Sequence, residues 1–478
     1  MERYAMFKKI DTNLIYNALY QLLLILVPIL TTPYLARTLG PNSLGIYGYV
    51  AAIAAFLGNF MLLGLNQFGV RTIAKSNSSN LIANFRDLWG TQIIVGIILL
   101  GAYLLFVILF APYKIFFLLE IPFLIGYGTD ISWLYIGVGK VKRVVVRNSI
   151  VKLISVVFIF IFIRDQSDLW KYFLINSLGI LLANMIFLID INRIGIRIRQ
   201  IHWKKYRSRF LSSLLFLAIP LVASQLYTNI DSALVGTFAG THQLAFYDQS
   251  QKIARVILAA LTSTSTVIMP KMAALDGHSD QSRLNKMFRL SLDVTLVVSL
   301  IFALLMMVNT NNFIPFFFGS SFVPMRQNMY WVSLIVIFIA YGSVFSLQLA
   351  LAKGLYRIYM IPYVVGALYS LFANTLFDTK YGAMGGTLVI VTTELIVCVL
   401  RIYMIRDYID LGEILRSHYK MVLAFVITLF VFKIVNFDGF NLYLSFVLNS
   451  IGALLCFVIM TLIIHDKTMA HLLYLLKI

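Results

Sequence analysis

Apolar runs of membrane-spanning length recur along the whole chain, and they constrain its fold more than any other feature. Each run has about 18–25 residues, enough for a helix to cross a hydrocarbon core roughly 30 Å thick. With 60% hydrophobic residues, 12% charged residues and a mean hydropathy of +0.87, the chain cannot be a soluble domain. The pattern predicts an all-α polytopic membrane protein with about fourteen transmembrane helices. The predicted spans are residues 14–36, 44–69, 88–110, 115–136, 147–163, 170–190, 211–238, 245–270, 290–308, 329–351, 358–377, 383–405, 418–435 and 442–464.

The net charge of +19 predicts how these spans are oriented. If the odd-numbered connections lie outside, the inside segments carry about 30 Lys and Arg residues and the outside loops about 7. Cytoplasmic loops of membrane proteins are enriched in Lys and Arg, so we expect both termini in the cytoplasm. The positive charge therefore indicates membrane orientation rather than nucleic-acid binding.

Two stretches of the chain, 200 residues apart, are faint copies of each other. Residues 40–54 and 240–254 agree at 5 of 15 positions, where chance gives about one. The identical pairs are Gly40 and Gly240, Leu44 and Leu244, Tyr47 and Tyr247, Ile53 and Ile253, and Ala54 and Ala254. Such repeats are typical of transporters with two helix bundles around a central path. Because each repeat has six spans, we expect a pseudo-twofold axis along the membrane normal.

The most basic connection, RIGIRIRQIHWKKYRSR at 193–209, separates the two repeats. We therefore predict an N-terminal lobe over residues 1–192 with spans one to six, followed by this segment as a cytoplasmic linker. A C-terminal lobe with spans seven to twelve is predicted over residues 210–410. Residues 411–478 are expected to form spans thirteen and fourteen and a cytoplasmic tail.

No motif for enzyme chemistry is present in the chain. There is no Gly-rich phosphate loop followed by Lys and Ser or Thr, so we do not expect ATP hydrolysis. The six histidines show neither H-E-x-x-H nor Cys/His metal spacing, and we infer no metal site, no catalytic residue and no cofactor. Cys398 and Cys456 fall inside predicted spans, where free thiols are the default.

The clearest polar stripe within the membrane is in the eighth span. Asp248, Lys252 and Arg255 are spaced by four and three residues, which places them on one helical face. An ionisable group in the bilayer core costs about 2.5–3.5 kcal/mol, so two cations near the midplane indicate a site for an anionic ligand. The alternative is an ion-paired stripe, with Asp248 or an acid from another span as the partner.

The first spans of the two repeats also carry polar stripes, and these suit opposite walls of a central cavity. The stripe of span one includes Asn17 and Gln21, one turn apart, followed by Pro28 as a source of a kink. The stripe of span seven includes Gln225, Thr228, Asn229 and Asp231. Hydrogen bonding between helices, without ligand contact, is the alternative for each of these residues.

Three further charged residues are candidates for function. Arg37 ends the first span at its outer face, where it either lines the cavity mouth or extends to the interface. Asp293 and Glu394 are single acids within later spans. They are candidates for coupling transport to protons or sodium, with packing or ion pairing as the alternative.

The stretch from Asn13 to Ala74 resembles the start of bacterial polysaccharide-repeat-unit flippases of the Wzx type. The resemblance lies in PILTTPYLARTLGPNSLGIYGYV at 28–50 and LGLNQFGVRTIAKS at 63–76, and it continues in the repeat copy at 216–274. These flippases belong to the multidrug/oligosaccharidyl-lipid/polysaccharide exporter superfamily.

The resemblance implies two six-helix lobes with alternating access, in the bacterial cytoplasmic membrane. It implies movement of an undecaprenyl-diphosphate-linked oligosaccharide from the inner to the outer leaflet, for capsule, exopolysaccharide or O-antigen synthesis. The implied partners are this substrate, membrane lipids, a polysaccharide polymerase and chain-length machinery. Lys252, Arg255 and Arg37 are then expected to bind the diphosphate, and the polar stripes to bind sugar. Because span two has no matching cation, the diphosphate site is expected to lie toward the second lobe.

Two other classes remain open. A drug or cation exporter of the same fold favours acids over cations in the second lobe, which the stripe of span eight opposes. A membrane enzyme, such as a polymerase or an acyltransferase, usually carries a large outside loop or a histidine within the membrane. The predicted spans of this chain leave room for neither.

Overall fold

The computed structural model describes residues 2–464 except 63, 78–79, 198–200, 216–224, 226–228, 278–280, 436 and 438. Side chains are described for these residues apart from 2–15, 17, 18, 267 and 277. Every regular element in this part of the chain is helical, which confirms the predicted all-α class. The chain divides into two compact units, residues 1–233 (unit 1) and 234–478 (unit 2).

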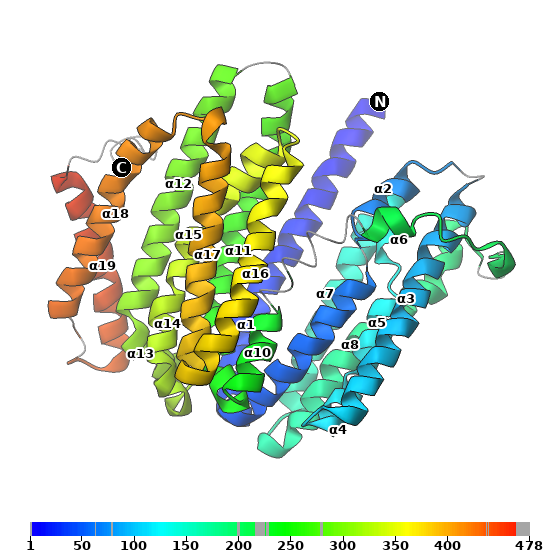
Figure 1. Ribbon diagram of the computed structural model, residues 1–478, viewed down its shortest axis with the longest axis horizontal. Helices are drawn as coiled ribbons and strands as arrows, with labels where there is room; N and C mark the ends of the chain where they lie inside the picture. The colour runs from blue at the N-terminus through cyan, green and yellow to red at the C-terminus, as the bar shows by residue number, and fades with distance from the viewer. Residues whose placement is uncertain are drawn as a thin grey trace. The chain divides into compact units, whose positions relative to one another are not determined.

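Unit 1 consists of membrane-length helices joined by short ones (Figure 1). Its elements are α1 (Glu2–Met61), α2 (Phe68–Ala74), α3 (Leu81–Leu109), α4 (Lys114–Leu119), α5 (Ile121–Gly128), α6 (Ser132–Gly137), α7 (Val141–Phe162), η1 (Gln166–Asp168), α8 (Leu169–Asp190), η2 (Ile191–Ile194) and η4 (Trp203–Lys205). The next helix, α10 (Asp231–Phe238), contains the boundary between the units.

Unit 2 has the same kind of construction, with a shorter first helix. Its elements are α11 (Thr241–Gly277), α12 (Gln281–Val308), α13 (Thr310–Phe317), η6 (Ser320–Met325), α14 (Arg326–Val332), α15 (Leu334–Ser343), η7 (Val344–Leu351), α16 (Tyr356–Tyr381), α17 (Ala383–Ile405), η8 (Arg406–Tyr408), α18 (Leu411–Ile434) and α19 (Leu442–Ile463). The η7 segment is a π-helix that continues α15.

Twelve helices in the described part of the chain are long and apolar enough to span a membrane. The first candidate, Leu19–Met61, has 43 residues, so a straight helix would extend roughly 65 Å, twice the hydrocarbon thickness. Gly40 interrupts this helix with φ 70° and ψ 177°, and Figure 1 shows the chain turning back there. Thus α1 contains the first predicted span and most of the second. The seventh predicted span, 211–238, lies partly outside the described residues, and the count of fourteen remains a prediction.

The two glycines that the sequence repeat pairs with each other have related backbones. Gly40 has φ 70° and Gly240 has φ 87°, both in a region that residues with a Cβ rarely adopt. Each glycine precedes a membrane-length helical segment that carries the repeat. Leu44 and Leu244, which follow them, are both buried. The structure therefore gives the paired glycines the same local role, the turn into the second span of each repeat.

The paired tyrosines also have comparable neighbours in their own units. In unit 1, the ring of Tyr47 lies 4.3 Å from that of Tyr172, in the first turn of α8. In unit 2, Tyr247 is fully buried and lies against Gly386, in the first turn of α17. A Cβ at Gly386 would lie 3.1 Å from Cε2 of Tyr247. Because α8 and α17 hold the last span of each repeat, the two copies pack alike within their units. The direction of the repeat axis remains a prediction.

Large apolar side chains cover the outer surfaces of these helices. On α8, Leu182 and Ile189 are 59% and 78% exposed, and similar residues line the other long helices. Water-exposed apolar surface of this extent is rare in soluble proteins, whereas lipid solvates it without penalty. The protein is therefore a multi-pass membrane protein.

Candidate functional site

A polar cavity of about 420 Å³ lies within unit 1. It is open to its surroundings and is bordered by α1, the end of α5, α7 and α8. Five asparagines and two tyrosines line it together with one acid and two cations. The lining residues are Tyr20, Leu24, Asn59, Leu62, Asn66, Tyr127, Asp130, Ser132, Arg147, Asn148, Val151, Lys152, Ser155, Asn176, Gly179, Ile180, Ala183 and Asn184.

The two cations of this cavity are carried by α7, a 22-residue helix of membrane-spanning length. Arg147 lies about 9 Å and Lys152 about 16 Å along the axis from the start of the helix, at 1.5 Å per residue. Lys152 is therefore near the middle of the hydrophobic layer. Because burying such charges in hydrocarbon is unfavourable, both side chains require a polar surface, and the cavity provides it.

Arg147 is held in place by unit 1 but is not neutralised directly. Its Nη1 donates a hydrogen bond to Oδ1 of Asn184 at 2.5 Å, and its guanidinium lies 4.0 Å from the centre of the Phe187 ring. The Nε atom is buried and has no hydrogen-bond partner among the described residues. The carboxylate of Asp130 attracts Arg147, but its two oxygens accept hydrogen bonds from the backbone N–H and hydroxyl of Ser132, at 2.8 and 2.9 Å.

Lys152 makes no hydrogen bond or ion pair with any residue that the structure describes, and its side chain is half-buried. The residues that line the cavity thus provide two positive charges and one negative charge. Two cations and one acid together attract an anion, and the cations donate hydrogen bonds to it.

Amide side chains form one wall of the cavity and connect it to a predicted site. Asn59 lines the cavity and donates a hydrogen bond to Oε1 of Gln225 at 3.2 Å. The same oxygen accepts a hydrogen bond from Nδ2 of Asn229 at 2.5 Å. Gln225 and Asn229 belong to the predicted polar stripe of span seven, so that stripe continues the asparagine wall within unit 1. Amides donate and accept together, as sugar hydroxyls require.

The other residues of the predicted stripes have varied environments. Asp231 is fully buried at the start of α10, and Gln21 is exposed on α1. Thr228 and the side chain of Asn17 lie outside the described part of the chain. Arg37 is exposed on α1, three residues before Gly40.

The basic stripe predicted for span eight lies on α11. Asp248, Lys252 and Arg255 are all half-buried. Nη2 of Arg255 donates a hydrogen bond to Oε1 of Gln251 at 2.7 Å, and the guanidinium also attracts the buried carboxylate of Glu394 on α17. Unit 2 therefore partly satisfies Arg255, whereas unit 1 leaves Lys152 unsatisfied.

The two acids considered for ion coupling differ in their surroundings. Asp293 accepts a hydrogen bond at 2.7 Å from Nε2 of His418, whose Nδ1 lies 2.7 Å from the hydroxyl of Tyr341. This chain joins α12, α18 and α15 within unit 2, and both Asp293 and His418 are buried. The expectation that no histidine lies within a span is therefore wrong, because the candidate span α18 begins at Leu411, seven residues before His418. Glu394 lies near Arg255 and Arg401. Both acids therefore have basic or hydrogen-bonding neighbours.

The sequence analysis missed the cations of unit 1. Arg147 and Lys152 were counted with the basic residues of the cytoplasmic connection before span five, although both lie within the predicted span 147–163. The helix begins at Val141, which places both residues further inside the span. The signal was available in the spacing of Asn148, Lys152 and Ser155, which puts three polar residues on one helical face. The first repeat thus carries its cavity-lining cations in span five rather than span two.

The chain matches the sequence profile of one protein family over more than half its length. The family is described as "Polysaccharide biosynthesis protein", and the match covers residues 10–276. A putative O-antigen transporter from Escherichia coli (strain K12) is 22% identical over 410 residues, covering 83% of this chain and 96% of the relative. A putative O-antigen transporter from Shigella dysenteriae is 22% identical over 389 residues, covering 78% and 94%.

Two classes of solved structures have a similar fold. Lipid II flippase MurJ in an inward closed conformation superposes with a TM-score of 0.71 at 15% identity, covering 95% of this chain and 99% of that one. An inward-facing multidrug resistance MATE family transporter of the MOP superfamily gives a TM-score of 0.63 at 15% identity, covering 82% and 94%. At this identity the likeness is one of fold.

Proposed function

Because the chain belongs to the polysaccharide biosynthesis protein family, we propose that it is a flippase for lipid-linked oligosaccharides. It moves undecaprenyl-diphosphate-linked repeat units from the inner to the outer leaflet by alternating access, for the synthesis of a surface polysaccharide. Its relatives are named as O-antigen transporters. The flippase fold suits a substrate with a polar head and a lipid tail.

The observation that carries this proposal is the cavity of unit 1, with two cations, one acid and an asparagine wall. The diphosphate of the substrate binds Lys152 and the free Nε of Arg147. Charge-assisted hydrogen bonds of this kind are roughly twice as strong as neutral ones. The sugars bind the amides of Asn59, Asn148 and Asn176.

Lys252 and Arg255 are proposed as a second diphosphate-binding pair, within unit 2. Both are half-buried on α11, a helix of membrane-spanning length, where a cation requires a polar surface. Gln251 and Glu394 already contact or attract Arg255, so its contribution is smaller than that of Lys152.

A drug or cation exporter of the same fold is the second candidate, and the MATE likeness is its support. A cationic drug requires acids or aromatic faces in its cavity. The cavity of unit 1 has more cations than acids, which favours an anionic substrate. A membrane enzyme is a weaker candidate, because the curated relatives are named as transporters.

The proposed orientation places both termini and the 193–209 segment in the cytoplasm, as the charge distribution indicates. Single cysteines at Ser208 and Thr241 provide the check. An impermeant thiol reagent applied to cells is expected to label the second position and not the first. Labelling of both from outside would contradict the orientation.

Transport itself is tested in proteoliposomes that contain the full chain and a fluorescent polyprenyl-diphosphate oligosaccharide. Oligosaccharide is expected to become accessible to an added glycosidase faster than in protein-free vesicles. A cationic dye, used as the substrate of the rival function, is expected to cross at the protein-free rate. Transport of the dye without transport of the lipid-linked sugar would support the exporter instead.

A further inference from the structure

A basic loop in unit 1 is fixed against one end of α3 by a single buried acid. Asp87 is 1% exposed, and its carboxylate pairs with the Nε atoms of Arg86 and Arg209, each at 2.8 Å. The backbone N–H of Arg207 donates to the same carboxylate at 3.3 Å. Two cations and a backbone donor thus saturate Asp87, and the loop over 201–209 has a defined position.

Aromatic contacts hold the same loop at a particular depth along α3. The ring of Trp203 lies 5.5 Å from that of Trp89, and the hydroxyl of Tyr206 lies 3.1 Å from Oγ1 of Thr91. Tyr206 packs over Gly90, where a Cβ would lie only 2.7 Å from its ring. Trp203 is 43% exposed.

The length of α3 shows what lies at this depth. Its uncharged part, from Leu88 to Leu109, is about 22 residues or roughly 33 Å long, which matches a hydrocarbon core of about 30 Å. The loop therefore lies where this core ends and the lipid headgroups begin. Exposed tryptophan and tyrosine side chains favour this layer.

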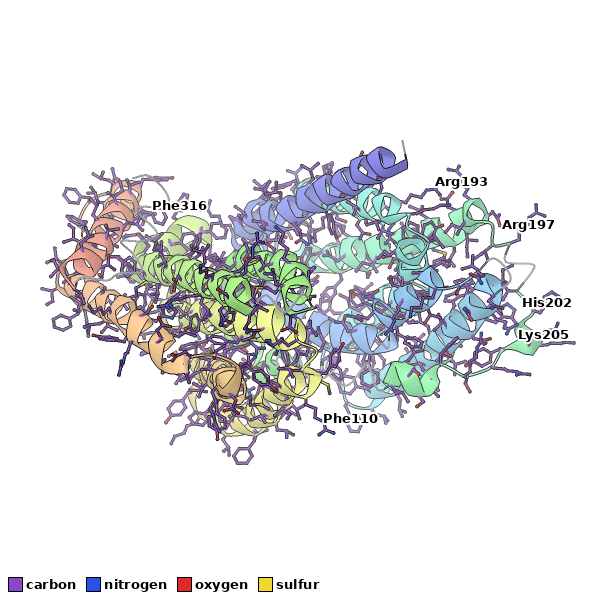
Figure 2. All side chains as sticks on the ribbon, turned by 90° about the horizontal axis from the view of Figure 1, so that it is seen from above. Phe110, Arg193, Arg197, His202, Lys205 and Phe316 are labelled. Carbon is purple, nitrogen blue, oxygen red and sulfur yellow. The ribbon has the colours of Figure 1, made fainter. Side chains whose placement is uncertain are left out.

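The loop borders a hollow of about 490 Å³ whose charged lining residues are mostly cations. The lining residues are Ala83, Arg86, Asp87, Lys204, Lys205, Tyr206, Arg207 and Arg209. The side chains of Lys204, Lys205 and Arg207 are exposed and have no acidic partner among the described residues. Figure 2 shows Lys205 pointing outward, with Arg193, Arg197 and His202 along the same edge of unit 1.

We infer that this hollow is a binding site for the phosphate headgroup of an anionic phospholipid. The headgroup contacts Lys204, Lys205 and Arg207, while the acyl chains lie along the apolar surface of α3. Membrane orientation requires only that the cytoplasmic loop carry an excess of Lys and Arg. It does not require that a buried acid hold the loop in place or that the loop lie at a fixed depth. The inference rests on the proposed orientation, because the cytoplasmic leaflet is the anionic one.

The site is tested by native mass spectrometry of the full-length protein released from nanodiscs that contain phosphatidylglycerol and phosphatidylcholine. The test variant carries Lys204→Gln, Lys205→Gln and Arg207→Gln. The matched control carries Lys286→Gln, Arg357→Gln and Arg416→Gln, three exposed cations of unit 2 for which the structure gives no ion pair. Both triple variants lose the same charge, so the comparison isolates the position of the cations.

Wild type and control are expected to retain phosphatidylglycerol in preference to phosphatidylcholine. The test variant is expected to lose at least tenfold in that preference, since each cation near an anionic surface contributes a fewfold factor. Rising salt weakens the preference of the wild type toward that of the variant. Equal retention by wild type and test variant, or equal loss in both triple variants, would overturn the site.

A competition arm separates the lipid headgroup from a soluble diphosphate. Inorganic pyrophosphate at millimolar concentration is expected to leave phosphatidylglycerol bound, because it lacks the acyl chains that hold the lipid on α3. Displacement of the lipid by pyrophosphate would overturn a phospholipid site and favour a diphosphate site. This binding assay contains no transport substrate, so its outcome is independent of the proposed flippase activity.

Discussion

In unit 2 the buried acid Asp293 is satisfied by neighbouring side chains, whereas in unit 1 Arg147 and Lys152 line an open cavity. The carboxylate of Asp293 is paired with His418, which in turn contacts Tyr341. Lys152 of unit 1 has no such partner in the described part of the chain. A polar group that is satisfied by its own unit contributes to stability, while one left facing a cavity is available to a ligand.

The buried share differs between individual spans, and within unit 2 it ranges from 18% in Thr241–Asp276 to 61%. In the spans Gln281–Val308 and Ser320–Leu351 of unit 2, 61% of the most apolar window is buried. In the span Val141–Phe162 of unit 1, which carries both cavity cations, the share is 17%. The helix that provides the cations therefore has few side chains sealed within its own unit.

The largest expected effect comes from removing both cations of unit 1. Arg147→Gln combined with Lys152→Gln removes two charge-assisted contacts, each of about 1.5–3 kcal/mol. Transport of the lipid-linked oligosaccharide in proteoliposomes is expected to fall by at least one to two decades. Lys142→Gln is the control, since it changes an exposed lysine of α7 outside the cavity. Equal losses in the control and the double variant would contradict the proposal that the cavity cations bind the substrate.

The buried chain of unit 2 should affect stability more than transport. Asp293→Ala leaves Nε2 of His418 without its acceptor, and an unsatisfied buried group costs about 1–3 kcal/mol. The melting temperature of the purified protein is expected to fall, while Asp293→Asn, which keeps an acceptor, retains most of the stability and the transport rate. Loss of transport in Asp293→Asn at unchanged stability would instead identify Asp293 as a coupling residue.

The paired glycines provide a stability test of the repeat. Alanine at either position is forced into an unfavourable backbone region, at a cost of about 1–3 kcal/mol. Gly40→Ala is expected to be the more damaging change, because its Cβ would lie 3.3 Å from Nε2 of Gln166, whereas nothing lies within 4 Å of the Cβ at Gly240. Thermal unfolding of both variants measures the difference. A tolerated alanine at both positions would argue against the equivalence of the two turns.

The smallest effect is expected at Arg255 of unit 2. Its neighbours Gln251 and Glu394 already interact with the guanidinium, so a ligand adds less to it than to Lys152. Arg255→Ala is expected to slow transport roughly fivefold, which corresponds to about 1 kcal/mol, and Arg255→Lys less, because the charge survives. A loss as large as that of the unit 1 double variant would show that the units contribute equally to substrate binding.

The all-α membrane class and the repeat could be predicted because apolar run length and glycine spacing are local properties of the sequence. The same holds for the polar stripe of span seven, of which Gln225 and Asn229 join the wall of the cavity through Asn59. The cations of unit 1 were missed because Arg147 and Lys152 follow closely on other basic residues. Charge alone does not distinguish a cytoplasmic loop from the first half of a span.

The partners of buried charged residues could not be predicted from the sequence, for a different reason. Asp293 and His418 are 125 residues apart, and only the packing of α12 against α18 brings them together. The same holds for Arg147 and Asn184 of unit 1. Whether a charged side chain within a span is satisfied or free depends on such long-range contacts.

Capture of the substrate inside unit 1 tests the central claim most directly. A photo-crosslinking amino acid at Asn176, which lines the cavity, is compared with one at Leu178 on the outer surface of the same helix. A radiolabelled lipid-linked oligosaccharide is expected to crosslink at position 176 but not at 178, and to lose most of that crosslink in the Arg147→Gln, Lys152→Gln background. Crosslinking at both positions alike, or a signal at 176 that survives loss of the cations, would contradict the account.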